Sequence, residues 1–205
     1  MSQPLGRVLI DRGRIAERTR DLGARLTADL LEDLQREGLG ADASQRIVLM
    51  PVLTGAMVFA ADLIRAMPLA MQVRAISVSS YPGKSTTSQG VTLRGDFPDD
   101  LGGTHVVLVD DIYDTGRTLA ALQALARAQS PASLRTCVLL SKRVERLAEA
   151  TVDYVGFEIP PEFVIGYGLD YDGMHRNLPD IRVLDPDAPA PAPVDLRSAG
   201  APDER

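Results

Sequence analysis

The fold of this chain is decided by the stretch Val106-Val-Leu-Val-Asp-Asp-Ile-Tyr-Asp-Thr-Gly-Arg-Thr-Leu119. Residues 106–109 are continuously apolar and mostly β-branched, as in a strand that is buried on both faces of a parallel sheet. Gly116 allows a tight turn, and the residues after it predict the start of a helix. Because the free N–H groups and the dipole at a helix start attract anions, the segment predicts a phosphate-binding turn.

Three carboxylates and two hydroxyls surround this glycine. Asp110 and Asp111 come just before the turn, where they can reach ribose hydroxyls or a magnesium-bound ribose. The alternative is an ordinary strand-to-helix turn with Asp114 or Thr115 as the N-cap. That alternative does not need so many polar side chains around one glycine. We therefore favour a phosphate site with its own sugar ligands.

Composition places the chain among ordinary globular proteins. Its 205 residues, 45% hydrophobic and 24% charged, predict one domain with at most a small appendage. The net charge of −6 provides no broad positive charge of the kind that binds nucleic acid. No apolar run is long enough to span a bilayer, and the first residues lack the apolar core of a signal peptide. We therefore expect a cytoplasmic protein with neither nucleic acid nor membrane as a partner.

The sequence offers few soft metal ligands. Cys137 is the only cysteine, so the chain can form neither an intrachain disulfide nor a cysteine zinc cluster. His105 and His175 are far apart and have no metal-ligand spacing to other candidates. Any metal must therefore be a hard cation, held mainly by substrate oxygens and carboxylates.

Strand and helix patterns alternate along the chain. Helical spacing predicts helices over residues 11–34, 56–66 and 118–128, and apolar runs predict strands over 47–53, 71–80, 91–94, 133–142 and 152–159. Their order predicts a parallel sheet whose ligands bind at the carboxyl ends of the strands. The polar segment 81–90 is expected to be a mobile loop. The Pro/Ala-rich residues 186–205 predict a disordered tail after a domain over residues 1–185.

The segment 106–119 resembles the 5-phosphoribosyl-1-pyrophosphate (PRPP) motif of type I phosphoribosyltransferases. The stretch Val155-Gly-Phe-Glu-Ile-Pro-Pro-Glu-Phe-Val-Ile-Gly-Tyr-Gly-Leu-Asp-Tyr171, followed by Arg176-Asn-Leu-Pro, closely resembles the purine-binding region of hypoxanthine-guanine phosphoribosyltransferases. Residues 51–55, 59–63 and 79–81 match the same family, in the expected order. The resemblance implies an α/β fold with a central, mostly parallel sheet flanked by helices, and a small hood formed by terminal segments.

The resemblance also implies roles for individual residues. The phosphate and ribose of PRPP would be bound by Asp110, Asp111, Asp114, Thr115, Gly116, Arg117 and Thr118. The pyrophosphate would contact Leu53, Thr54, Gly55 and Arg176, and the purine would contact Lys142, Phe163, Val164 and Asp170. Ser80 and Tyr81 would belong to the flexible loop that closes over the site.

Several of these roles have a clear chemical reason. Asp114 would be the general base for the proton on purine N7, with helix capping as its other possible role. Lys142 would donate to the 6-oxo group. Phe163 would stack on the purine unless it serves the core, and Val164 would offer backbone hydrogen bonds. Asp170 would be a magnesium-associated carboxylate, with Asp110 and Asp111 contributing through the ribose.

One position departs from the family pattern. Many members have Leu-Lys-Gly in the first pyrophosphate loop, where this chain has Leu53-Thr54-Gly55. The family often shows a nonproline cis peptide bond there, which points backbone amides at the pyrophosphate. Thr54 keeps this backbone option and removes the positive charge.

The activity implied by the resemblance is purine salvage with Mg²⁺ as the cofactor. Hypoxanthine, and also guanine, would react with PRPP to give the nucleoside 5′-monophosphate and pyrophosphate, in a homodimer or homotetramer. The alternatives are a xanthine-preferring phosphoribosyltransferase, or a regulator that senses PRPP and binds nucleic acid. The acidic net charge and the intact purine segment weigh against the regulator.

Overall fold

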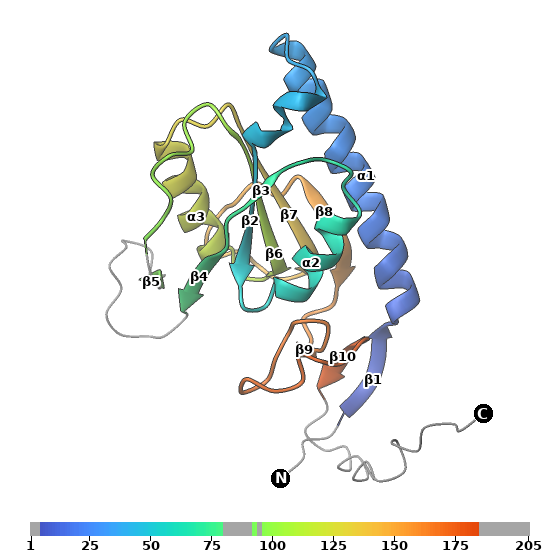
Figure 1. Cartoon of the computed structure of the whole chain (residues 1–205). Helices are drawn as coiled ribbons and strands as arrows, with labels where there is room; N and C mark the ends of the chain where they lie inside the picture. Colours follow the sequence, from blue (N-terminus) through green and yellow to red (C-terminus); the bar gives the residue numbers. More distant parts are fainter. Residues whose placement is uncertain (1–4, 80–91, 94–95, 185–205) are drawn as a thin grey trace, which may run out of the picture.

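The computed structural model describes residues 5–79, 92–93 and 96–184. Its centre is a seven-stranded sheet in the order β5-β4-β2-β6-β7-β8, with β3 also paired to β2 (Figure 1). The pairs are parallel except β4 with β5. The strands are β2 (Ile47–Leu53), β3 (Gln72–Val73), β4 (Ile76–Ser79), β5 (Thr92–Leu93), β6 (His105–Tyr113), β7 (Ser133–Lys142) and β8 (Tyr154–Ile159). The predicted mostly parallel sheet is therefore confirmed.

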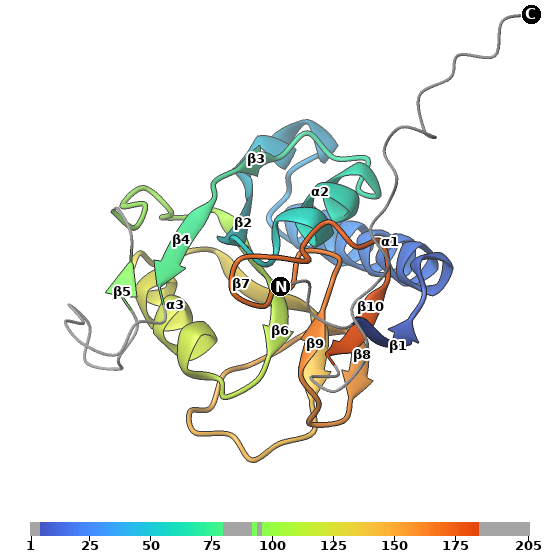
Figure 2. The ribbon, with the colours of Figure 1, turned by 90° about the horizontal axis from the view of Figure 1, so that it is seen from below.

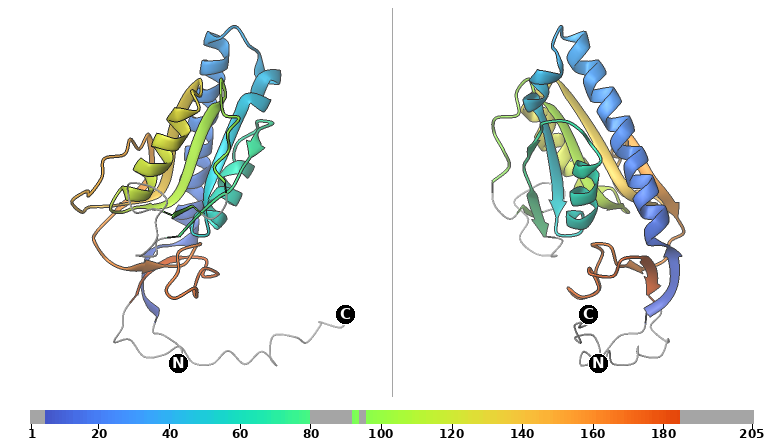
Figure 3. Two further views of the ribbon diagram at one scale, coloured as in Figure 1. Left: turned by 90° about the vertical axis from the view of Figure 1, so that its left-hand side faces the viewer. Right: turned by 45° about the vertical axis from the view of Figure 1, so that its right-hand side comes forward.

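Helices cover both faces of this sheet, and the sheet lies between them in Figure 3. The helices α1 (Arg12–Arg36) and α2 (Met57–Arg65) lie on one face, and α3 (Arg117–Ala128) lies on the other. A short 3₁₀ helix, η1 (Ala41–Arg46), precedes β2. Alternate residues of β2 and β6 pack into two apolar clusters, one of which contains Leu49 and Val107 and the other Met50 and Leu108. The sheet is therefore buried on both faces, as the apolar runs predict.

Helix α1 is stabilised by an N-terminal cap and by an apolar stripe that packs into the core. The Asp11 side chain accepts hydrogen bonds from the amides of Gly13 and Arg14 at 2.9 and 3.0 Å. The buried stripe consists mainly of Ile15, Leu22, Leu26, Leu30 and Leu34. Each fully buried side chain of this kind contributes about 1.5–3 kcal/mol. The predicted helix over 11–34 is confirmed to within two residues at its end.

A second, smaller sheet forms the hood. Its order is β1-β10-β9 and both pairs are antiparallel, with bounds β1 (Leu5–Ile10), β9 (Val164–Ile165) and β10 (Ile181–Leu184). The two ends of the described chain therefore meet in one sheet, as the implied hood requires. Figure 2 shows that the β9–β10 connection passes across the carboxyl ends of the central strands. The hood thus faces the edge of the large sheet where ligands bind in such folds.

Some predicted boundaries are wrong. The strand expected over 71–80 is two short strands, because the chain leaves the ladder at Arg74 and Ala75, although the Arg74 amide still donates to the Leu49 carbonyl at 2.9 Å. The strand expected from residue 152 begins at Tyr154, since the Asp153 carboxylate instead accepts from the Thr136 amide at 2.7 Å. Of the strand expected over 91–94, the structure describes residues 92–93.

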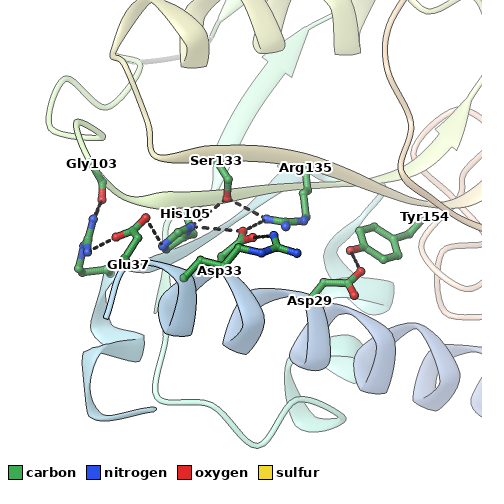
Figure 4. A network of polar contacts seen from close by, with 10 residues as sticks. Asp29, Asp33, Glu37, Gly103, His105, Ser133, Arg135 and Tyr154 are labelled. Atoms are coloured by element: carbon green, nitrogen blue, oxygen red, sulfur yellow. Dashed lines mark hydrogen bonds and ion pairs between the residues drawn. The ribbon is translucent and has the colours of Figure 1, made fainter. Parts of the chain in front are cut away.

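A polar network joins α1 to the amino ends of the central strands (Figure 4). His105 begins β6, and its Nδ1 lies 2.9 Å from Oγ of Ser133 at the start of β7. Its Nδ1 and Nε2 lie 3.6 and 3.4 Å from carboxylate oxygens of Asp33 and Glu37, respectively. Arg135 pairs with the same Asp33 at 2.5 Å. This network lies at the end of the sheet opposite the hood.

Residues 80–91 and 185–205 lie outside the described structure, and the predicted loop over 81–90, Ser80, Tyr81 and the tail fall there. Among the helices that the structure describes, none is long and apolar enough to cross a membrane.

Candidate active site

A cavity of about 740 Å³ opens at the carboxyl ends of β2, β4 and β6, beneath the hood. Four parts of the chain line it: the end of β2 with the β2–α2 loop, β4, the end of β6 with the β6–α3 turn, and the β9–β10 connection. The sequence predicts many of its lining residues, namely Leu53, Thr54, Gly55, Asp110, Asp111, Asp114, Thr115, Gly116, Thr118, Asp170 and Arg176. It does not predict Val52, Ser77, Val78, Ile112, Tyr113, Leu119 and Gly173, which also line the cavity.

The β6–α3 turn leaves a helix start open toward this cavity. Gly116 has a φ of +84° and is the N-cap of α3, and within the described residues no side chain caps this start. The alternative in which Asp114 or Thr115 caps the helix is therefore wrong. A β-carbon at Gly116 would overlap the carbonyl oxygen of Ala148. The turn therefore requires glycine at this position for two reasons, the positive backbone angle and the close packing against Ala148.

Two adjacent carboxylates, Asp110 and Asp111, lie on β6 next to the turn. The strand extends beyond the apolar run 106–109 and continues to Tyr113, so both carboxylates belong to its carboxyl end. Burial, together with the neighbouring Asp111 charge, raises the pKa of Asp110 well above its usual range. Burial also raises the pKa of Asp111, although the nearby positive charge of Arg176 lowers it in part. Carboxylates held out of water in this way are stabilised by hydroxyl donors or a cation, and a ribose diol supplies such donors.

The β2–α2 loop approaches these carboxylates through its backbone. The Leu53–Thr54 peptide bond is cis, as the resemblance implies. A β-carbon at Gly55 would overlap the Asp111 carboxylate, and one at Gly168 of the hood would overlap the Gly55 carbonyl. Thr54 is exposed and adds no charge. The loop therefore offers mainly backbone groups, packed between β6 and the hood.

Arg176 brings positive charge to the hood side of the cavity. Its Nη2 pairs with the Asp170 carboxylate at 2.7 Å, and its Nη1 donates to the Gly168 carbonyl at 2.6 Å. Asp170 also accepts from the Gly173 amide at 2.8 Å. These contacts hold Arg176 and Asp170 side by side at the cavity wall. Such an arginine can donate two parallel hydrogen bonds to a phosphate group.

Lys142 and Asp114 meet at the ends of β7 and β6. The Lys142 ammonium lies 3.1 Å from an Asp114 carboxylate oxygen. The lysine side chain is 15% exposed and the aspartate side chain 43% exposed. An ammonium has three donors, so this pair leaves Lys142 donors for a ligand. The pairing was not predicted, because residue types alone do not show which ends of strands are adjacent.

Phe163 and Val164 belong to the hood, where Val164 begins β9 and Phe163 precedes it. Phe163 is 50% exposed, so the core role is wrong for it, and its ring meets that of Tyr171 edge-on at 5.5 Å. Val164 is buried in β9, where it pairs with Val183. In the part of the chain that the structure describes, the residues lining the cavity do not include Arg117, Lys142, Phe163 or Val164. These four predicted site residues therefore lie outside the described cavity lining.

The cavity carboxylates suit a hard cation only together with a ligand. Among the described residues, no group of three or more His, Cys, Asp or Glu residues could hold a metal ion. Asp110, Asp111 and Asp170 nonetheless present oxygen donors to one cavity. Mg²⁺ is commonly held by one or two carboxylates with substrate phosphates and water, so this donor set fits it.

An open helix start, an adjacent pair of carboxylates and an arginine at the carboxyl edge of a parallel sheet are the arrangement expected of a phosphoribosyltransferase. Residues 19–172 match the phosphoribosyl transferase domain. The chain belongs to the hypoxanthine-guanine phosphoribosyltransferase family. It is 43% identical over 174 residues to the hypoxanthine-guanine phosphoribosyltransferase of Mycobacterium avium, covering 84% of this chain and 80% of that protein. The Bacillus subtilis protein of that name is 37% identical over 187 residues, which are 91% of this chain and 97% of its own.

Solved structures agree with this family. The hypoxanthine phosphoribosyltransferase of Trypanosoma cruzi, in complex with the product IMP, has a TM-score of 0.78 and 38% identity, over 89% of this chain and 95% of that one. A hypoxanthine-guanine phosphoribosyltransferase from Bacillus anthracis, with HEPES in its active site, has a TM-score of 0.76 and 34% identity, over 88% and 99%.

Proposed function

We propose that this chain transfers the 5-phosphoribosyl group from PRPP to hypoxanthine, and also to guanine, giving IMP or GMP and pyrophosphate in purine salvage. The observation that carries this proposal is the cavity itself. It brings the open α3 start, the Asp110–Asp111 pair and Arg176 together in one space. Each of these groups suits a different part of PRPP.

The 5′-phosphate would lie at the β6–α3 turn, where the free amides and the hydroxyls of Thr115 and Thr118 can donate to it. The ribose hydroxyls would donate to Asp110 and Asp111 and so relieve their desolvation. The pyrophosphate would lie between the β2–α2 loop and Arg176. When bound with it, Mg²⁺ would supply charge neutralisation for this leaving group, with Asp170, Asp110 and Asp111 as the nearby oxygen donors.

The purine would lie toward the hood, on the side of Phe163. Lys142 would donate to the 6-oxo group, and the backbone of Val164 would hydrogen-bond the ring. Asp114, which the structure holds 3.1 Å from Lys142, would accept the N7 proton as the glycosidic bond forms. The catalytic work is thus positioning and charge stabilisation.

Nucleotide formation tests the proposal directly. The purified protein is incubated with PRPP, Mg²⁺ and one of four bases: hypoxanthine, guanine, xanthine or adenine. We expect IMP and GMP to form rapidly, and a chelator to abolish turnover. A preference for xanthine would replace the 6-oxopurine assignment with the xanthine alternative. No product from any base, together with a PRPP-dependent shift of nucleic acid in a gel, would support the regulator instead.

We also propose that the chain assembles as a homodimer or homotetramer. The proposal is supported by a relative: one solved structure of the Trypanosoma cruzi enzyme concerns the role of its C-terminal region in oligomeric state and activity, with a TM-score of 0.79 and 38% identity over 89% of this chain and 93% of that one. Sedimentation equilibrium would decide it, and a monomer at micromolar concentration would contradict it.

A further inference from the structure

One arginine that the proposed chemistry does not use connects the two strand ends that carry Asp114 and Lys142. Arg146 lies in the segment after β7 and is half-buried. Its Nη1 donates to the backbone carbonyls of Tyr113, at 3.2 Å, and of Asp114. Its Nη2 donates to the Lys142 carbonyl at 2.7 Å and to the Ser141 hydroxyl at 3.1 Å. A single planar group therefore joins the end of β6 to the end of β7.

The surrounding segment holds this arginine in place. The Arg146 guanidinium carbon lies 3.9 Å from the centre of the Tyr113 ring, within the range of a cation–π contact. The Tyr113 hydroxyl donates to the Ala150 carbonyl at 3.2 Å. The amides of Leu147 and Ala148 both donate to the Thr115 carbonyl, at 3.0 and 3.2 Å. The segment 146–150 thus wraps around the outside of the β6–α3 turn.

The chemistry of these contacts indicates a geometric role. All four hydrogen-bond partners of Arg146 are neutral oxygen atoms. The guanidinium therefore acts here as a rigid fork of donors, which a lysine cannot reproduce because its three donors radiate from one atom. Its partners include the backbone carbonyls of both Asp114 and Lys142, whose side chains pair at 3.1 Å.

We propose that Arg146 is a positioning residue that fixes the separation of Asp114 and Lys142, and through it the placement of the purine relative to the ribose. This inference rests on the proposed function, since it assigns a consequence to the roles of those two side chains. A displacement of about 1 Å at reacting groups can lower turnover on the order of 10²-fold. The loss of the fork should therefore affect turnover much more than PRPP binding, because the phosphate turn keeps its bonds from Leu147 and Ala148.

The test compares Arg146→Lys with Arg143→Lys in the full-length enzyme. Arg143 is a matched control, because it is exposed and pairs at 3.2 Å with Glu158 on the surface. We expect Arg146→Lys to lower kcat for IMP formation at least about tenfold while the KM for PRPP changes less than about threefold. Arg143→Lys should match the native enzyme. Equal kcat values for the two variants would overturn the proposal.

A double-variant cycle distinguishes positioning from general damage. If Arg146 acts through Asp114, then Arg146→Lys should lower kcat far less in the Asp114→Asn background than in the native one. Equal fold-losses in both backgrounds would overturn the proposal. If thermal unfolding shows that Arg146→Lys is poorly folded, Arg146→Ala replaces it. This variant is assayed with and without millimolar ethylguanidinium, which can occupy the place of the missing guanidinium. If the added cation does not restore turnover, the proposal is overturned. An inactive native enzyme would instead overturn the proposed function.

Discussion

At the scale of single residues, Asp114 is the side chain on which the proposed chemistry depends most. It lies at the cavity wall, and the capping role that sequence alone leaves open for it falls to Gly116. Its carboxylate pairs instead with the Lys142 ammonium at 3.1 Å. The structure thus excludes the capping role, and the role as general base stays a prediction.

We predict that Asp114→Asn lowers turnover roughly 10²-fold or more, the usual range for a positioned acid–base group. The amide keeps the size of the side chain but cannot accept the N7 proton in the same way. PRPP binding should remain close to native, because the open helix start and the carboxylate pair are unchanged. Pre-steady-state IMP formation and PRPP titration measure the two effects. Near-native turnover would remove Asp114 from the mechanism.

The Lys142 ammonium predicts the choice of base. It has donors only, so it pairs with a 6-oxo group and not usefully with the 6-amino group of adenine. A site built around such a bond can discriminate on the order of 10⁴-fold. Lys142→Ala should therefore lower kcat/KM for hypoxanthine and guanine strongly and leave the negligible adenine rate unchanged. Comparable efficiency with adenine and hypoxanthine in the native enzyme would contradict the role of Lys142.

At the scale of elements, the β6–α3 turn depends on the backbone of Gly116. Gly38 is a matched control, because its φ of +74° is similar to the +84° of Gly116, but a β-carbon at Gly38 would meet no heavy atom of the described residues within 4 Å. Gly38→Ala should cost about 1 kcal/mol for the left-handed backbone alone. Gly116→Ala should cost more and also weaken PRPP binding, because the Ala148 carbonyl must move. Urea unfolding and PRPP titration test this, and equal effects of the two substitutions would contradict it.

The elements also show what sequence can and cannot predict. The apolar runs of β2, β6 and β7 and the stripe of α1 are strong periodic signals, so their positions are predicted well. The strand β1 is missed and the break at Arg74 is invisible, because short edge strands depend on their partners more than on their own pattern. In the site, the 106–119 motif predicts one wall of the cavity, namely Asp110, Asp111, Asp114, Thr115, Gly116 and Thr118. Arg146 is missed because its partners are backbone carbonyls of other segments, which leave no residue pattern.

At the scale of the whole molecule, the His105 network joins α1 to the sheet at the end remote from the site (Figure 4). His105 is 1% exposed. Burial lowers its pKa below the usual 6.5, although the facing carboxylates of Glu37 and Asp33 act in the opposite direction. Arg46 and Arg135, which face the same ring, add to the lowering. The folded state therefore favours the neutral imidazole.

This pKa shift predicts an acid-sensitive stability. The folded-state pKa lies below the unfolded-state value, so unfolded chains bind more protons between the two values, and stability falls as pH decreases below about 6.5. Above that pH the ring is neutral in both states and the effect disappears. We expect the stability difference between native protein and His105→Gln, measured by urea unfolding, to shrink as pH falls from about 8 to 5. A difference that does not change with pH would contradict a shifted pKa for His105.

The hood has a consequence for the order in which the protein is made. Its sheet pairs β1, near the start of the chain, with β10, which ends at Leu184. The ribosome releases β1 long before β10 has been synthesised. Strand β1 therefore cannot pair with β10 until almost the whole domain has been made. The β9–β10 connection carries Asp170 and Arg176, so the cavity wall that they form is also completed last. The central strands can pair earlier, as domains fold during synthesis from the N-terminal side. A nascent chain stalled before β10 should thus hold a formed central sheet and an incomplete binding site, and we expect activity to appear only after β10 has been released.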